Sequence, residues 1–246
     1  MSTLSIIVPA YNEAKTIEEL LKKVLQVKLP SDYKKEVIVI NDCSKDATAD
    51  IVKKLSQKFP EITFLNNEKN MGKTQTVRKG ILHSTGEYVV IQDADLEYDP
   101  NDFVEMLRIA IAKDYDVVYG DRFGKENKVI YKRNYWGNKA LSAFSNFFTY
   151  SRIQTWIPDM ETCYKMCRGE IIRKIAENIE AKTNFGLEPE LTAKLSLYKR
   201  KGKNLRFAIY PISYYPRTIA EGKKIRFTDG FHALKEIVLF NLFPGN

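Results

Sequence analysis

The chain has 246 residues, 44% of them apolar, 28% charged and 12% aromatic, which fits one globular domain with a substantial core. This composition excludes a disordered tail and a small disulfide-stapled module. The net charge is +8, and it is uneven, since residues 1–123 carry 17 basic and 20 acidic side chains and residues 124–246 carry 22 and 11. A basic second half suits an anionic partner such as phosphate, nucleic acid or lipid, or is a solvated Lys-rich surface.

The first half alternates short apolar runs with segments of helical periodicity. The pattern predicts strands over residues 4–9, 36–41, 62–66, 87–92 and 116–120, and helices over residues 14–27, 46–58, 74–84 and 101–113. Strand–helix alternation with short connections predicts an α/β fold, a mainly parallel sheet with helices on both faces. Ligands of such sheets bind beyond the carboxyl ends of the strands.

The second half is less regular. It predicts a loop over residues 124–132, a helix over 134–150, a strand over 162–167, helices over 168–178 and 188–199, a strand over 205–210 and a last helix over 229–242. No linker, low-complexity segment or internal repeat divides the chain. We therefore expect a single domain, residues 1–246, with a C-terminal elaboration.

Polar side chains gather at the ends of the predicted strands. They are Tyr11, Asn12 and Glu13 after the first strand, Asp42 and Ser44 after the second, Asn70 and Lys73 after the third, and Asp93 and Asp95 after the fourth. Charged groups are rarely buried without a partner, so core packing does not explain them, although ordinary loop polarity accounts for part of the set. Their convergence predicts a binding site at this edge of the sheet.

Two carboxylates, Asp93 and Asp95, directly follow an apolar strand, and Glu97 comes two positions later. Residues i and i+2 of an extended backbone point to the same side. Three carboxylates aimed at one point suit Mg²⁺ or Mn²⁺, which prefer oxygen ligands and often share them with phosphates. Taken alone, Asp-x-Asp is also common in solvated loops and helix caps, and its place at a strand end favours the metal site.

Other phosphate-binding motifs fit poorly. Met71-Gly72-Lys73-Thr74 imitates the end of a P-loop, but the first glycine of that motif would have to stand where Asn67 does. No Gly-x-Gly-x-x-Gly follows a strand. Walker-type NTPases and dinucleotide dehydrogenases are therefore disfavoured, and Lys73 lies near a phosphate or in solvent.

Several motifs together resemble glycosyltransferase family 2 enzymes with a GT-A fold. In the first half these are Ile7-Val-Pro9-Ala-Tyr11-Asn-Glu13, Asn41-Asp42-Cys43-Ser44, Asn70-Met-Gly72-Lys73, Asp93-Ala-Asp95-Leu-Glu97 and Gly120-Asp-Arg122. In the second half they are Pro158-Asp159-Met-Glu-Thr162-Cys-Tyr164, Phe185-Gly-Leu-Glu188-Pro-Glu190, and Arg217 with Lys223-Lys224. Within the family, the chain is similar to the dolichyl-phosphate mannose synthase group and its bacterial polyprenyl-phosphate relatives.

The resemblance implies roles for individual residues. The nucleoside pocket would be lined by Pro9, Tyr11, Glu13 and Asp42, and the metal on the diphosphate would be held by Asp93, Asp95 and Glu97, with Ala94 and Lys73 also in the donor site. Basic positions that contact donor or acceptor phosphates are matched by Arg122, Arg133, Arg217 and Lys224. Glu97 replaces the Gln usual in eukaryotic and archaeal relatives, which puts metal preference in question, and either Lys223 or Lys224 serves as the family's lysine.

The implied activity is an inverting, metal-dependent transfer of a hexose from GDP-mannose or a UDP-hexose to a dolichyl or undecaprenyl phosphate. A divalent ion with Arg and Lys groups stabilises a departing diphosphate. Residues 1–123 would bind the nucleotide sugar and residues 124–246 the acceptor. A phosphate monoester is already largely dianionic at neutral pH, so it needs cations rather than a general base.

The alternative is a family 2 enzyme that glycosylates a saccharide hydroxyl in envelope polysaccharide synthesis, which requires a base. Asp159 is the preferred candidate, with Glu188 and Glu190 also considered, and helix capping is the plain explanation for Asp159. We expect Asp95, Asp159 and Arg133 to be the catalytic residues. Nucleic-acid binding is disfavoured because the positive charge is scattered between carboxylates and no such motif is present.

A lipid acceptor would draw the protein to a membrane. The predicted helices over 134–150 and 229–242 are rich in aromatic and apolar residues, and they either lie on an anionic membrane or pack on the sheet. No apolar run reaches the roughly 18 residues needed to span a bilayer. Three cysteines, two histidines and a start without an apolar signal lead us to expect a cytoplasmic protein, peripheral at the membrane face, without disulfides or a Cys/His zinc site.

Overall fold

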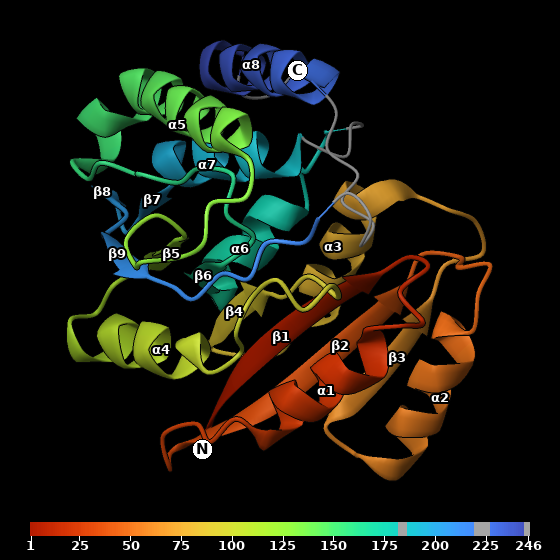
Figure 1. Cartoon of the computed structure of the whole chain (residues 1–246). Coiled ribbons are helices and arrows are strands. Elements are labelled where there is room, and N and C mark those ends of the chain that lie inside the picture. Colours follow the sequence, from red (N-terminus) through yellow and green to blue (C-terminus); the bar gives the residue numbers. More distant parts are fainter. Residues whose placement is uncertain (182–185, 219–226, 244–246) are drawn as a thin grey trace.

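The computed structural model of the chain describes residues 1–181, 186–218 and 227–243. Its main strands are β1 (Ser2–Ala10), β2 (Tyr33–Asn41), β3 (Ile62–Asn66), β4 (Tyr88–Ile91), β5 (Val117–Asp121), β6 (Lys165–Arg168) and β9 (Phe207–Pro211). Within the described residues they form a seven-stranded sheet in the order β3-β2-β1-β4-β6-β5-β9 (Figure 1). All pairings are parallel except those of β6, which is antiparallel to both β4 and β5. The expected mainly parallel α/β sheet is confirmed.

Helices cover both faces of the sheet, as expected. They are α1 (Ile17–Gln26), α2 (Thr48–Lys58) and α4 (Asp102–Ala112) below the sheet in Figure 1, and α3 (Gly72–His83), α6 (Gly169–Ala176) and α7 (Leu187–Leu197) above it. The helix α3 approaches β1 and β2 very closely. A Cβ added to Gly80 would lie 2.5 Å from the side chains of Ile7 and Ile40, so only glycine fits there.

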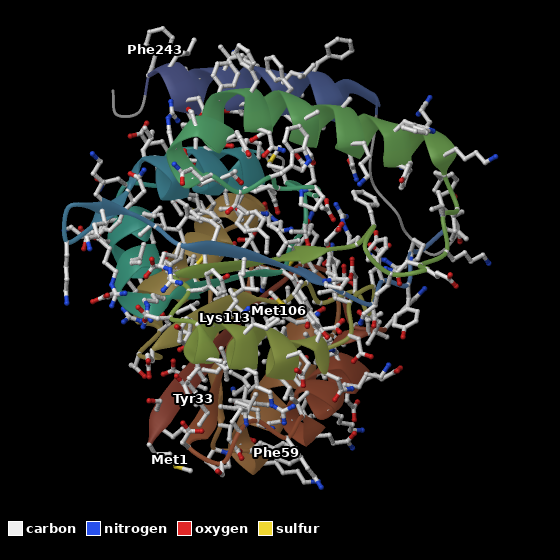
Figure 2. The ribbon with its side chains drawn as sticks, turned by 90° about the vertical axis from the view of Figure 1, so that its left-hand side faces the viewer. Met1, Tyr33, Phe59, Met106, Lys113 and Phe243 are labelled. Atoms are coloured by element: carbon white, nitrogen blue, oxygen red, sulfur yellow. The ribbon has the colours of Figure 1, made fainter. Side chains whose placement is uncertain are left out.

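Two further helices, α5 (Lys132–Ile153) and α8 (Phe227–Leu242), lie side by side beyond α7, at the top of Figures 1 and 2. Figure 2 labels Phe243 at this end of the molecule and Met1 at the opposite end. The helix α5 extends past the expected 134–150 and ends where Gln154 adopts a φ of 52°. A short hairpin of β7 (Lys199–Arg200) and β8 (Lys203–Asn204) was not predicted; Lys201 and Gly202 have the positive φ of its turn.

Candidate functional site

The carboxyl ends of the parallel strands deliver polar segments to one edge of the sheet. Ala10 pairs with Asn41 in the register of β1 and β2, so the segments that follow them begin side by side. The backbone turns sharply just beyond, with a positive φ at Asn12 (56°), Cys43 (57°) and, after β4, Leu96 (63°). Side chains other than glycine adopt this conformation at a cost in free energy, and such residues cluster at functional sites.

These segments line a cavity of about 1160 Å³. Twelve of the predicted site residues line it: Pro9, Tyr11, Glu13, Asp42, Lys73, Asp93, Ala94, Asp95, Glu97, Arg122, Arg133 and Arg217. Asp159 does not line the cavity, and Lys223 and Lys224 lie outside the described residues. The structure therefore brings together residues from positions 9 to 217 that the chain order keeps far apart.

Asp42 borders the cavity and binds the start of α3. Its carboxylate accepts hydrogen bonds from the backbone N–H groups of Met71 (2.7 Å) and Gly72 (2.9 Å), at the start of α3. It also accepts one from the side-chain amide of Asn67 (2.9 Å). A carboxylate at a helix N-terminus is favoured by the helix dipole, so Asp42 fixes α3 against β2.

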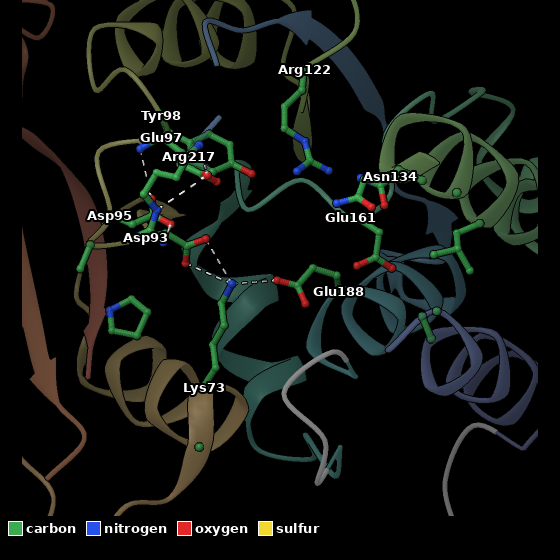
Figure 3. A pocket seen from close by; sticks show the side chains of 18 of the residues that line it. Lys73, Asp93, Asp95, Glu97, Tyr98, Arg122, Asn134, Glu161, Glu188 and Arg217 are labelled. Carbon is green, nitrogen blue, oxygen red and sulfur yellow. Dashed lines mark hydrogen bonds and ion pairs between the residues drawn. The ribbon is translucent and has the colours of Figure 1, made fainter. Parts of the chain in front are cut away.

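The carboxylates after β4 surround Arg217 (Figure 3). The guanidinium Nη2 of Arg217 lies 2.7 Å from Oδ2 of Asp95, and its backbone N–H donates to Oε1 of Glu97 at 2.6 Å. Tyr214 donates its hydroxyl to the other oxygen of Glu97 at 2.7 Å. Burial raises the pKa of Asp95 to about 7, with smaller contributions from the charges of Asp93 and Glu97 and an opposing one from Arg217. Arg217 thus offsets only part of the effect that burial and the neighbouring carboxylates have on Asp95.

As they stand, the three carboxylates do not form a ready metal site. In the described ranges 1–181, 186–218 and 227–243, no three His, Cys, Asp or Glu side chains are arranged to hold a metal ion. Asp93 pairs with Lys73 and Asp95 pairs with Arg217 instead. The donor set is nonetheless the all-oxygen one that Mg²⁺ and Mn²⁺ prefer.

Lys73 bridges two acidic side chains across the cavity. Its Nζ lies 3.1 Å from Oδ1 of Asp93 and 3.2 Å from Oε1 of Glu188, at the start of α7 (Figure 3). Burial alone would lower the pKa of Lys73, but the charges of Asp93 and Glu188 carry it well above its ordinary value. Lys73 is therefore a fixed cation beside the carboxylate cluster and not a solvent-exposed side chain.

Arg122 is held by a buried carboxylate. Its Nε and Nη2 each lie 2.7 Å from an oxygen of Asp159, and its backbone N–H donates to Oδ2 at 3.2 Å. Asp159 is fully buried, whereas Arg122 reaches the cavity. Burial would lower the pKa of Arg122, and Asp159 raises it well above the ordinary value. The carboxylate of Asp159 thus orients a cation at the cavity wall.

Sequence reasoning missed Glu161 as a site residue and considered Glu188 only as a possible base. Both side chains line the cavity. Oε1 of Glu161 is buried and has no hydrogen-bond partner among the described residues. Glu190, the other carboxylate considered, is fully buried away from the cavity and accepts the backbone N–H groups of Glu180 and Ala181. The sequence contained one indication of a role for Glu161, since it stands two positions after Asp159, which was already a candidate site residue.

The helix α5 lines part of the cavity and buries several polar side chains. It buries Ser142, Ser145, Asn146 and Thr149. The side chains of Ser142 and Asn146 bond to backbone groups of the loop after the helix, and the Thr149 hydroxyl donates to a backbone carbonyl of α5 itself. It exposes Trp136 (68%) and Phe147 (79%). The helix α8 buries Ala233, Ile237 and Phe240 and exposes Phe231 and Leu234, which also border the cavity. Each helix therefore both packs on the protein and presents apolar side chains outward.

No helix in the described part of the chain combines the length and the hydropathy required to cross a bilayer.

The fold and the strand-end carboxylates together define a glycosyltransferase. Residues 5–176 match the sequence profile described as Glycosyl transferase family 2, so the chain belongs to this family. A dolichyl-phosphate beta-glucosyltransferase of Dictyostelium discoideum is 30% identical over 247 residues, covering 96% of this chain and 72% of that protein. Another, of Trichomonas vaginalis, is 40% identical over 107 residues, 42% of this chain and 32% of the relative. The chain thus aligns with about a third of that relative's length.

Solved structures agree on the GT-A fold. Glucosyl-3-phosphoglycerate synthase from Mycobacterium tuberculosis, in complex with Mn²⁺, uridine diphosphate and phosphoglyceric acid, superimposes with a TM-score of 0.66 at 16% identity, covering 100% of this chain and 80% of that one. A mannosyltransferase from Pyrobaculum calidifontis, in complex with GDP-Man and Mn²⁺, has a TM-score of 0.57 at 19% identity, covering 98% and 70%. The predicted family, fold and enzyme class are confirmed.

Proposed function

We propose that this enzyme transfers a hexose from a nucleotide sugar to a polyprenyl phosphate, with inversion at the anomeric carbon and with the help of Mg²⁺ or Mn²⁺. One observation carries the proposal. A single cavity is bordered by the carboxylates after β4, by cations from four separate segments and by the apolar side chains of α5 and α8. A donor with a diphosphate and an acceptor with a phosphate and a hydrocarbon chain together require these three kinds of surface.

The donor nucleotide would lie at the strand ends of residues 1–123. Pro9, Tyr11, Glu13 and Asp42 border this part of the cavity. A carboxylate offers about four lone-pair sites, and three are used when Asp42 accepts its three protein N–H groups, so one remains for a base. Structural neighbours in complex with uridine diphosphate or GDP-Man support a nucleotide donor here.

Asp93, Asp95 and Glu97 would hold the metal ion. Their oxygens are the hard ligands that a divalent cation prefers, and burial, together with the charges of Asp93 and Glu97, raises the pKa of Asp95. A bound ion would neutralise charge on the diphosphate as it departs. The ion and the Arg217 guanidinium would compete for the carboxylate of Asp95. With the ion bound, we therefore expect Arg217 to leave Asp95 and to bind a phosphate oxygen.

The remaining cations would position the two phosphates. Four of them, Arg122, Arg133, Lys73 and Arg217, border the cavity. An oxygen of the acceptor phosphate attacks the anomeric carbon, and the bond from that carbon to the diphosphate breaks with both electrons leaving on oxygen. No base is required, because the acceptor is already deprotonated. This suits a site in which Asp159, the candidate base, is buried and committed to Arg122.

The acceptor lipid would enter along α5 and α8, in residues 124–246. Exposed aromatic side chains on both helices suit a peripheral membrane contact, and the basic second half suits the anionic cytoplasmic leaflet. The names of the curated relatives, dolichyl-phosphate beta-glucosyltransferases, support a lipid phosphate as acceptor.

The acceptor can be tested with a matched pair of lipids. A short polyprenyl phosphate and the corresponding polyprenol, which lacks only the phosphate, are offered in detergent with UDP-glucose or GDP-mannose and Mn²⁺. We expect sugar on the polyprenyl phosphate and none on the alcohol. A third reaction offers an oligosaccharide in place of the lipids, and transfer to its hydroxyl groups, with neither lipid used, would instead favour the polysaccharide alternative.

A further inference from the structure

The segment that follows β9 runs back along the segment that follows β4, and the two meet at Glu97. Tyr98 and Tyr214 form an antiparallel bridge there, and the backbone N–H of Tyr215 donates to the carbonyl oxygen of Glu97 at 2.8 Å. The Tyr214 hydroxyl donates to Oε2 of Glu97 at 2.7 Å, and the backbone N–H of Arg217 donates to Oε1 at 2.6 Å. Both carboxylate oxygens of Glu97 are therefore held by the segment after β9.

The ring of Tyr214 is fixed by contacts that do not involve its hydroxyl. It packs edge to face against the ring of Tyr98, with centroids 5.3 Å apart, and the Arg122 guanidinium lies 5.2 Å from its centroid. The side chain of Asn127 accepts the backbone N–H of Tyr214 at 3.1 Å and donates to the carbonyl oxygen of Arg122 at 2.8 Å. These contacts set the direction in which the hydroxyl points.

This arrangement lies at the proposed metal site. Glu97, Arg122 and Tyr214 all line the cavity, and the Glu97 residue is only 8% exposed. A tyrosine hydroxyl carries its proton at neutral pH, so toward a carboxylate it acts as a hydrogen-bond donor. The Glu97 carboxylate is thus already oriented before an ion arrives, and less conformational freedom remains to be lost when it binds one.

We propose that Tyr214 is a positioning residue for the divalent ion, because its hydroxyl holds the Glu97 carboxylate in the orientation that binds the ion. Groups that hydrogen-bond to metal ligands contribute about 10–100-fold to metal affinity. The same ring lies against Arg122, so one side chain also fixes the carboxylate relative to a cation that would bind phosphate. This inference rests on the proposed function, in which Glu97 is a metal ligand.

The test compares two variants that each lose one tyrosine hydroxyl. Tyr214→Phe removes the donor to Glu97 and keeps the ring that packs against Tyr98 and Arg122. Tyr88→Phe is the matched control, because Tyr88 is buried, lies outside the cavity lining and donates its hydroxyl to the backbone carbonyl of Tyr115 at 3.1 Å. Electron paramagnetic resonance of free Mn²⁺ measures the Mn²⁺ affinity of each protein at one concentration of UDP or GDP, whichever the wild type binds.

We expect Tyr214→Phe to weaken Mn²⁺ binding about tenfold, whereas Tyr88→Phe binds Mn²⁺ as the wild type does. Calorimetry without metal should give the same nucleotide affinity for all three proteins. In urea unfolding, the two variants should lose comparable stability, since each gives up one buried hydrogen bond. A merely structural role of Tyr214 would not separate metal affinity from stability in this way.

A double-mutant cycle tests whether Tyr214 acts through Glu97. Glu97→Gln removes the charge of the carboxylate, and adding Tyr214→Phe to it should weaken Mn²⁺ binding no further. A second loss of about tenfold in the double variant would overturn the proposal, because the hydroxyl would then act by another route.

Three other results would overturn it: unchanged Mn²⁺ affinity in Tyr214→Phe, an equal loss in Tyr88→Phe, or an equal loss of nucleotide affinity without metal. Nucleotide binding without metal also reports a folded site, so a misfolded variant cannot be mistaken for support. A wild type that binds the nucleotide but no Mn²⁺ or Mg²⁺ would instead overturn the metal dependence in the proposed function.

Discussion

The buried pair of Arg122 and Asp159 provides the sharpest test of the site's architecture. Asp159→Asn keeps the volume of the side chain but leaves the Arg122 guanidinium, whose side chain is only 10% exposed, without its counter-charge. Two hydrogen bonds of 2.7 Å are weakened together. Removing one partner of such a pair costs about 3–5 kcal/mol, which lowers the melting temperature of a chain this long by about 6–20 °C.

The assay is thermal and urea unfolding of wild type and variant, followed by circular dichroism at one pH. Glu18→Gln is the control, because its ion pair with Lys22 is 2.7 Å long but both side chains are more than half exposed. That change should leave the unfolding midpoint nearly unchanged, because solvent screens an ion pair between exposed side chains. A loss below about 1 kcal/mol in Asp159→Asn, or one equal to that of the control, would refute the claim that Asp159 holds Arg122 at the cavity wall.

Three other predictions follow from packing, surface and charge. Gly80→Ala should cost about 1–3 kcal/mol in urea unfolding, because its Cβ would meet two isoleucine side chains of β1 and β2 at 2.5 Å; an unchanged midpoint would contradict the close packing of α3. Replacing the exposed Trp136 and Phe147 together by Ser should weaken binding to anionic vesicles about tenfold, as measured by co-sedimentation, while hydrolysis of the donor in detergent persists. Equal binding by variant and wild type would rule out α5 as a membrane contact. Glu161 keeps a proton in the folded state up to about pH 8 and ordinarily loses it near 4.5, so its contribution to stability is full below 4.5 and is lost as pH rises toward 8. The stability of Glu161→Gln relative to wild type should therefore rise across that window, and a flat difference would show that the pKa is not raised.

The strand-end part of the site could be predicted from the sequence because it depends on topology alone. Parallel strands place their carboxyl ends at one edge, so Asp42, Asp93 and Asp95 meet there whatever the details of packing. The helical periodicity and the short connections also predicted most helices and strands, whose observed bounds agree with the predicted ones within a few residues. For residues 1–123, the order of strands and helices along the chain was sufficient to predict where the site lies.

What escaped prediction depends on contacts between distant segments. The strand β6 inserts between β4 and β5 in antiparallel direction, which local periodicity does not encode. Arg217 reaches Asp95 from 122 positions away. The burial of Asp159 beside Arg122, and the lack of a partner for Oε1 of Glu161 among the described residues, depend on neighbours supplied by other elements.

Transfer of labelled sugar to lipid tests the central claim most directly. GDP-mannose and a series of UDP-hexoses are supplied in turn with Mg²⁺ or Mn²⁺ and a short polyprenyl phosphate in detergent, to wild type and to Asp95→Asn. We predict that one donor labels the lipid, that chelation of the metal stops the reaction, and that Asp95→Asn slows it by at least about a hundredfold. Metal-dependent hydrolysis of the donor, with no label on the lipid phosphate at any concentration, would contradict the claim.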